Sequence, residues 1–60
     1  MYIVKTYFEN GEFNNAFFYP SKKLALTFAD RTMKLKPLCM VKVYRIMFDS
    51  DGELYTEFLN

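Results

Sequence analysis

The chain has 60 residues, a length that forms one domain at most, and we assign residues 1–60 to a single small domain. Hydrophobic residues make up 52% and aromatic residues 20% of the chain, which excludes an intrinsically disordered protein. The formal net charge of +1 is close to zero, but the charges are unevenly distributed along the chain, an asymmetry that bears on partners rather than on the fold.

The first predicted element is a β-hairpin. Residues Tyr2–Phe8 are rich in the aromatic and β-branched types that suit a pleated surface. Asn10-Gly11 stands between two apolar runs and predicts a tight turn in which both residues take a positive φ. Phe13–Tyr19 is the predicted return strand, and Pro20 ends it because proline has no backbone donor for the ladder.

A helix is predicted over Lys22–Lys36, with Ser21 as its N-cap. Its apolar residues fall on one broad arc at a period of 3.6 residues. We expect Leu24, Phe28 and Leu35 to be buried against the sheet. The helix ends before Pro37, because proline cannot continue a helix and disfavours helical geometry in the residue before it.

A second hairpin follows, with strands predicted over Leu38–Phe48 and Leu54–Leu59. Gly52 suits the left-handed position of a short bulged loop between them. A three-residue loop sets a register in which Arg45 faces Glu57, and we expect a cross-strand ion pair there.

These elements predict an α+β fold of β-β-α-β-β order. Two hairpins joined by one helix, with short right-handed connections, give a four-stranded antiparallel sheet in the order 2-1-3-4. The helix then covers one face of the sheet and leaves the other face uncovered.

No residue pattern in the chain indicates catalysis, so we expect no enzyme and no cofactor. Histidine is absent, and the single cysteine, Cys39, is read as a buried structural thiol at the start of a strand. Asp49, Asp51 and Glu53 resemble part of a calcium loop, but strands rather than helices flank them. We therefore assign these acids to turn chemistry and expect no metal site.

The chain is expected to lie in the cytoplasm. A lone cysteine fits a reducing compartment, the first residues do not resemble a signal peptide, and the longest apolar stretches are far too short to span a membrane. No membrane partner is predicted.

The excess of bulky apolar residues is the strongest functional signal. Both alternations of the predicted strands carry large side chains, but one helix covers only one sheet face. The second face should therefore present an aromatic patch, which usually marks an interface. The candidate protein-binding residues are Tyr7, Phe18, Tyr44 and Phe48.

Two further kinds of partner follow from the sequence. Asp30 is the single acid in segment 20–47, which holds every lysine and arginine except Lys5, so nucleic acid is the alternative partner. Its candidate contacts are Lys23, Arg31 and Lys34. A homodimer is also expected, formed either by hiding the aromatic face or by pairing of edge strands.

The layout of the chain resembles the short accessory proteins of bacterial viruses. The likeness lies in the opening Met-Tyr-Ile-Val-Lys-Thr-Tyr-Phe-Glu-Asn-Gly, in the Ser21–Leu35 helix and in the turn-ended strand pair. This resemblance implies a viral inhibitor or antitoxin-like protein that binds and blocks a host or defence protein in an infected bacterial cell. It carries no functional residues over, because such proteins share no motif.

Overall fold

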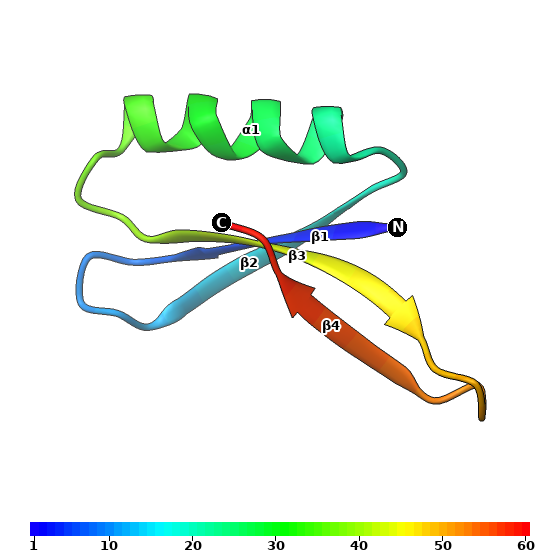
Figure 1. Cartoon of the computed structure of the whole chain (residues 1–60). Coiled ribbons are helices and arrows are strands. Elements are labelled where there is room, and N and C mark those ends of the chain that lie inside the picture. The colour runs from blue at the N-terminus through cyan, green and yellow to red at the C-terminus, as the bar shows by residue number, and fades with distance from the viewer.

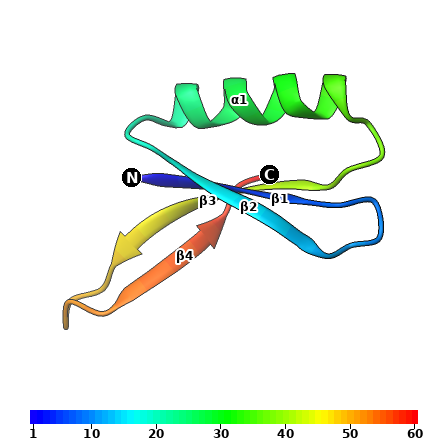
Figure 2. The same cartoon turned by 180° about the vertical axis from the view of Figure 1, so that it is seen from behind.

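The computed structural model describes residues 1–60 and confirms the predicted order of elements (Figure 1). The elements are β1 (Tyr2–Tyr7), β2 (Phe13–Tyr19), α1 (Lys22–Leu35), β3 (Val41–Phe48) and β4 (Leu54–Phe58). The strands form one antiparallel sheet in the predicted order β2-β1-β3-β4. Helix α1 lies on one face of this sheet, and both views show the other face without a covering element (Figures 1 and 2).

The first hairpin turns through residues 9–11 and corrects the predicted Asn-Gly turn. The Phe8 N–H donates to the Glu12 carbonyl at 2.8 Å, and the Gly11 N–H donates to the Phe8 carbonyl at 2.9 Å. Gly11 alone takes a positive φ, of 90°. The Asn10 carboxamide oxygen instead accepts the Glu12 N–H at 2.9 Å. This local bond favours an ordinary conformation at Asn10, so the loop has three residues rather than two.

The second hairpin has the same loop, as its sequence predicts. The Asp49 N–H donates to the Glu53 carbonyl at 3.0 Å, and Gly52 has a φ of 81°. The Asp49 carboxylate accepts the N–H groups of Asp51 and Glu53 at 3.0 and 2.8 Å. Turn formation therefore accounts for the position of Asp49.

The predicted register of β3 and β4 is confirmed, but the expected ion pair is not formed. Arg45 faces Glu57 across the ladder, yet the single salt bridge of the chain joins Asp30 and Lys34 on the helix. The Arg45 guanidinium lies instead over the Tyr2 ring, 6.0 Å from its centroid. The ring face attracts the cation where the exposed carboxylate offers little net gain.

Most element boundaries match the prediction; the ends of β1, α1 and β4 differ by one residue and the start of β3 differs by three. Lys36 is the C-cap of α1 rather than its last residue, and its N–H donates to the Thr32 carbonyl at 2.9 Å. The Cys39 N–H donates to the Lys36 carbonyl at 3.0 Å, which closes a turn where the sequence predicted strand. Strand β3 therefore begins at Val41 rather than at Leu38.

The C-terminal ends of β1 and β4 account for the remaining differences. Phe8 belongs to the first loop rather than to β1. Leu59 and Asn60 leave β4 and return toward the core, where the Asn60 carbonyl accepts the Val43 N–H at 2.7 Å.

The core lies between α1 and the two central strands and consists of Val4, Ala25, Ala29 and Val43. The expectation that Leu24 and Leu35 would be buried is wrong, because they are 51% and 75% exposed. The two alanines occupy the centre of the helix face, where small side chains let the helix approach the strands. Both leucines are left beside that contact rather than within it.

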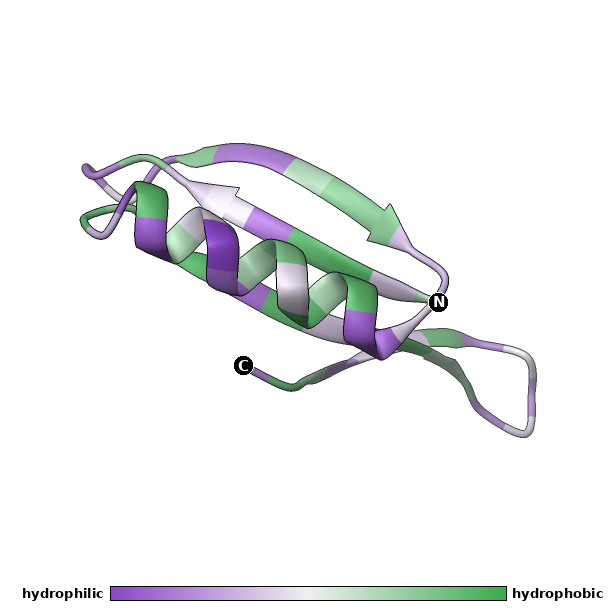
Figure 3. Cartoon of the chain, turned by 90° about the horizontal axis from the view of Figure 1, so that it is seen from above, coloured by the Kyte–Doolittle hydropathy of each residue, from purple (hydrophilic) through white to green (hydrophobic).

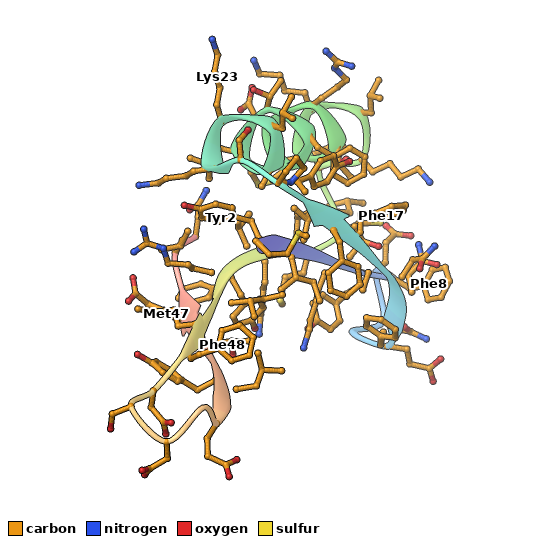
Figure 4. The ribbon with its side chains drawn as sticks, turned by 90° about the vertical axis from the view of Figure 1, so that its right-hand side faces the viewer. Tyr2, Phe8, Phe17, Lys23, Met47 and Phe48 are labelled. Atoms are coloured by element: carbon orange, nitrogen blue, oxygen red, sulfur yellow. The ribbon has the colours of Figure 1, made fainter.

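Phe28 does reach the sheet, as predicted, although it is only half-buried. Its ring packs on Phe17 and Tyr19, with centroids 4.9 and 5.4 Å away. Figure 4 shows Tyr2 and Phe17 directed toward the helix side of the sheet. Only 6 of the 60 residues are buried, and valines are the largest fully buried side chains. The isolated domain therefore has a small core and a narrow margin of stability.

Candidate binding face

The sheet face opposite α1 is the candidate site, and we call it the open face. Val4 and Val43 point to the helix, so their neighbours Ile3 and Tyr44 point away from it. Figure 4 shows Met47 and Phe48 on opposite sides of β3, with Phe48 on the open face. The open face is formed by Ile3, Lys5, Tyr7, Phe13, Ala16, Phe18, Lys42, Tyr44, Ile46, Phe48, Leu54, Thr56 and Phe58.

A continuous apolar row crosses the open face from one edge of the sheet to the other. Phe18 on β2 pairs with Ile3 on β1, Ile3 pairs with Tyr44 on β3, and Tyr44 pairs with Phe58 on β4. The Tyr44 and Phe58 rings meet edge to face, with centroids 5.6 Å apart. These neighbours leave Ile3 only 9% exposed, although no helix covers it. The row therefore has a packed centre and two exposed aromatic ends.

Further apolar side chains lie toward the two hairpin loops. Phe13 packs edge to face on Tyr7, with centroids 5.9 Å apart, and Phe48 pairs with Leu54. The large apolar side chains of the open face that are more than half exposed are Phe13, Phe18, Phe48, Leu54 and Phe58. So many exposed residues on one face indicate an interaction surface.

The centre of the open face is cationic. Lys5 and Lys42 face each other across β1 and β3. Their ammonium groups reach diagonally over aromatic rings: the Lys5 Nζ lies 5.1 Å from the Tyr44 centroid, and the Lys42 Nζ lies 5.4 Å from the Tyr7 centroid. No aspartate or glutamate belongs to the open face, so neither lysine has an acidic partner there.

All four residues predicted for protein binding, Tyr7, Phe18, Tyr44 and Phe48, lie on the open face. The structure brings Phe18 and Tyr44 into one row and places Tyr7 and Phe48 toward the two loops. Sequence reasoning missed Phe58 and the two lysines. The predicted register of Arg45 with Glu57 also pairs Phe58 with Tyr44 and could have placed Phe58 on this face, but the Lys5–Lys42 pairing depends on contacts between distant segments.

The residues predicted for nucleic-acid binding lie elsewhere, on the outer side of α1. Lys23, Arg31 and Lys34 are all exposed, and Figure 4 shows Lys23 directed away from the sheet. Asp30 lies among them, and its carboxylate is 3.0 Å from the Lys34 ammonium. This cluster therefore contains an internal counter-charge, whereas the open face does not.

A second apolar feature is a cleft of about 270 Å³ between the end of α1 and the first hairpin. Phe8, Phe17, Phe28 and Leu35 line it together with Cys39. The Cys39 thiol, predicted to be buried at the start of a strand, is only half-buried and lies in a turn. Leu35 lines the cleft although its side chain remains largely exposed.

No helix of the structure has the length and apolar character needed to cross a membrane. Comparison of the chain with protein-family models, with curated proteins and with solved structures finds no match. The open face is therefore the candidate site on its geometry alone.

Proposed function

We propose that this chain is a non-enzymatic binding module whose open face docks on a protein partner. The observation that carries the proposal is the set of more than half-exposed apolar residues on a face with no covering element. Phenylalanine and tyrosine supply large contact areas at a low cost in conformational entropy, and aromatic residues dominate binding hot spots. Covering one such side chain completely contributes roughly 1.5–3 kcal/mol.

The charges of the open face favour a partner that carries acidic groups among apolar ones. Lys5 and Lys42 are both cationic, lie at the centre of the face and lack an acidic neighbour. Like charges directly opposite each other destabilise a sheet. An acidic group on the partner would relieve this repulsion. The two lysines would then fix the orientation of the partner on the open face and increase the rate of association.

The small core gives a second reason for a partner. A ligand that binds only the folded state stabilises it by mass action. With 6 of 60 residues buried, the isolated chain has little stability in reserve. Docking on the open face would place Ile3 and Tyr44 in a two-sided core and raise the free energy of unfolding.

The resemblance to short accessory proteins of bacterial viruses supplies the class of partner. On that basis we propose a bacterial host or defence protein, bound and blocked in the cytoplasm. No catalytic step is needed for such a role, because occupancy of the target surface is sufficient.

The first experiment captures partners from bacterial lysate, with and without nuclease, and then measures the affinity of the purified partner for variants of the chain. We expect Phe18→Ala and Phe48→Ala each to weaken binding by roughly tenfold or more, the loss of about 1.4 kcal/mol typical of a moderate hot spot. Both side chains are mostly exposed, so the fold should survive their truncation.

Leu38→Ala is the matched control, because Leu38 is 75% exposed and lies in the turn before β3. We expect it to leave the affinity within about twofold of the original value. Lys5→Gln combined with Lys42→Gln should weaken binding and reduce its dependence on salt. A partner that binds both phenylalanine variants at full affinity would contradict the proposal.

Nucleic acid is the second candidate, favoured by the position of Lys23, Arg31 and Lys34 on one side of α1. The net charge of +1 and the Asp30–Lys34 ion pair oppose it. We expect no significant binding to short duplex or single-stranded oligonucleotides at physiological salt. Two results together would favour nucleic acid over a protein partner. The captured partner would disappear after nuclease treatment, and binding would depend steeply on salt and weaken when these three residues are neutralised.

A further inference from the structure

Strand β4 forms an unprotected edge of the sheet. All five of its residues, Leu54–Phe58, are exposed, and α1 contacts β1, β2 and β3 but not β4. Seen from above, the β3–β4 hairpin extends past the start of the helix (Figure 3). The strand contains no proline, lysine or bulge, which are among the devices that prevent an edge from pairing with another chain, and its one charged residue is Glu57.

The hydrogen bonds of the hairpin show which backbone groups of β4 are free. Asp49 and Glu53 form a hydrogen-bonded pair next to the loop. Bonded and non-bonded pairs alternate along an antiparallel ladder, so Tyr55 and Glu57 bond to β3. The N–H and C=O groups of Leu54, Thr56 and Phe58 therefore point outward from the sheet.

The other edge of the sheet, β2, carries three features that hinder its pairing with another strand. Its pairing with β1 is interrupted by a register shift between Thr6 and Tyr7. The Asn15 side chain accepts the Ala16 N–H at 2.8 Å, which occupies an outward-directed donor in the middle of the strand. Pro20 follows its last residue. None of these three features occurs in β4.

We propose that two copies of the chain pair through β4, antiparallel and centred on Thr56. In this register Thr56 faces its own copy, and Leu54 faces Phe58 of the other chain on the open face. Both of these apolar side chains are 61% exposed in the single chain. Tyr55 then faces Glu57, so no two charges of the same sign meet.

Neighbouring registers are less favourable. Centring the pair on Glu57 brings two carboxylates directly opposite each other, which is destabilising. Centring it on Tyr55 leaves Phe58 beyond the end of the partner strand, beside the loop. Thr56 is the centre that uses all three outward-directed residues of both strands.

The proposed pairing continues the sheet across a two-fold axis perpendicular to it. Both helices then lie on the same side, and the two open faces join into one surface. A face-to-face dimer is disfavoured, because it would bring Lys5 and Lys42 of both copies together without an acid. The proposal does not depend on what the open face binds.

Sedimentation equilibrium at tens of micromolar tests the association, and we expect a dimer. Thr56→Lys places like charges opposite each other at the centre of the pairing and should raise the dimer dissociation constant by roughly tenfold or more. Asn14→Lys, an equivalent change on the β2 edge, should leave this constant unchanged. Phe18→Ala should also leave it unchanged, because Phe18 lies at the opposite edge of the open face.

A cross-linking experiment tests the register, using single cysteines in a Cys39→Ser background and a short thiol-reactive linker. Only a residue on the two-fold axis lies next to its own copy, so Thr56→Cys should cross-link in far higher yield than Leu54→Cys or Phe58→Cys. A monomer at tens of micromolar overturns the proposal. A dimer that tolerates Thr56→Lys, or that cross-links equally at all three positions, overturns it as well.

Discussion

Ala25 and Ala29 occupy the buried centre of the helix face, a position that larger apolar residues usually occupy in a small domain. Each is almost completely buried, and they contact Val4 and Val43 directly. Helical periodicity defines a broad apolar arc but not its centre, because every apolar residue on the arc satisfies the pattern equally. The distance between helix and sheet decides the centre, and that distance depends on contacts the periodicity does not contain.

The alanine-centred core predicts different effects for substitutions at buried and at exposed positions of the apolar arc. Ala29→Leu should destabilise the fold by about 1–3 kcal/mol, because the added atoms overpack the contact with the strands. Leu35→Ala should change the free energy of unfolding by no more than about 0.5 kcal/mol, since that side chain is 75% exposed. Urea unfolding followed by circular dichroism measures both. A larger loss from Leu35→Ala than from Ala29→Leu would contradict this core.

At the scale of elements, local chemistry predicts most of the structure. Ser21, Gly11 and Gly52 act through the backbone within a few residues of themselves, so the helix start and the positions of both turns could be predicted from the sequence, although the length of the first loop could not. The turn at Leu38 could not be predicted in this way. Its apolar side chain is typical of a strand, but the backbone after Pro37 forms a turn. The side chain and the backbone gave conflicting signals there, and the backbone bond prevailed.

The N-cap of α1 gives a prediction at this scale. The Ser21 hydroxyl accepts the Leu24 N–H at 3.2 Å, and no acid lies in the first turn to offset Lys22 and Lys23. Ser21→Ala should cost about 1 kcal/mol and lower the melting temperature by about 4–8 °C. Ser21→Asp is the control: it keeps an acceptor and adds a favourable charge, so its melting temperature should equal or exceed the original. Equal melting of the alanine and aspartate variants would show that the cap contributes nothing.

At the scale of the whole molecule, strand alternation is enough to find the open face but not its charge. Alternation separates the two sides of each strand, and the strand pairing places Tyr7, Phe18, Tyr44 and Phe48 on one face. The pairing of Lys5 with Lys42 arises from the β1–β3 register, which joins segments far apart in the chain. The cationic centre of the candidate site therefore became visible only once the sheet was assembled.

The strand order also has a consequence for how the chain reaches this state. β1 comes first in the sequence but lies in the middle of the sheet, and Tyr2 pairs with Arg45. Each hairpin closes a loop of three residues, whereas the central ladder closes one of about forty, at an entropy cost about 2 kcal/mol higher. We therefore expect the hairpins and the helix to form before the two halves of the sheet join.

Pulse-labelled hydrogen exchange during refolding can follow that sequence of events. The amides of Phe8 and Asp49 close the two hairpin loops, while the Tyr7 amide donates to Met40 and the Ile46 amide donates to Met1 across the central junction. Protection should appear at Phe8 and Asp49 first. Simultaneous protection of all four amides would mean that the central ladder forms together with the hairpins, in one nucleus that spans the chain.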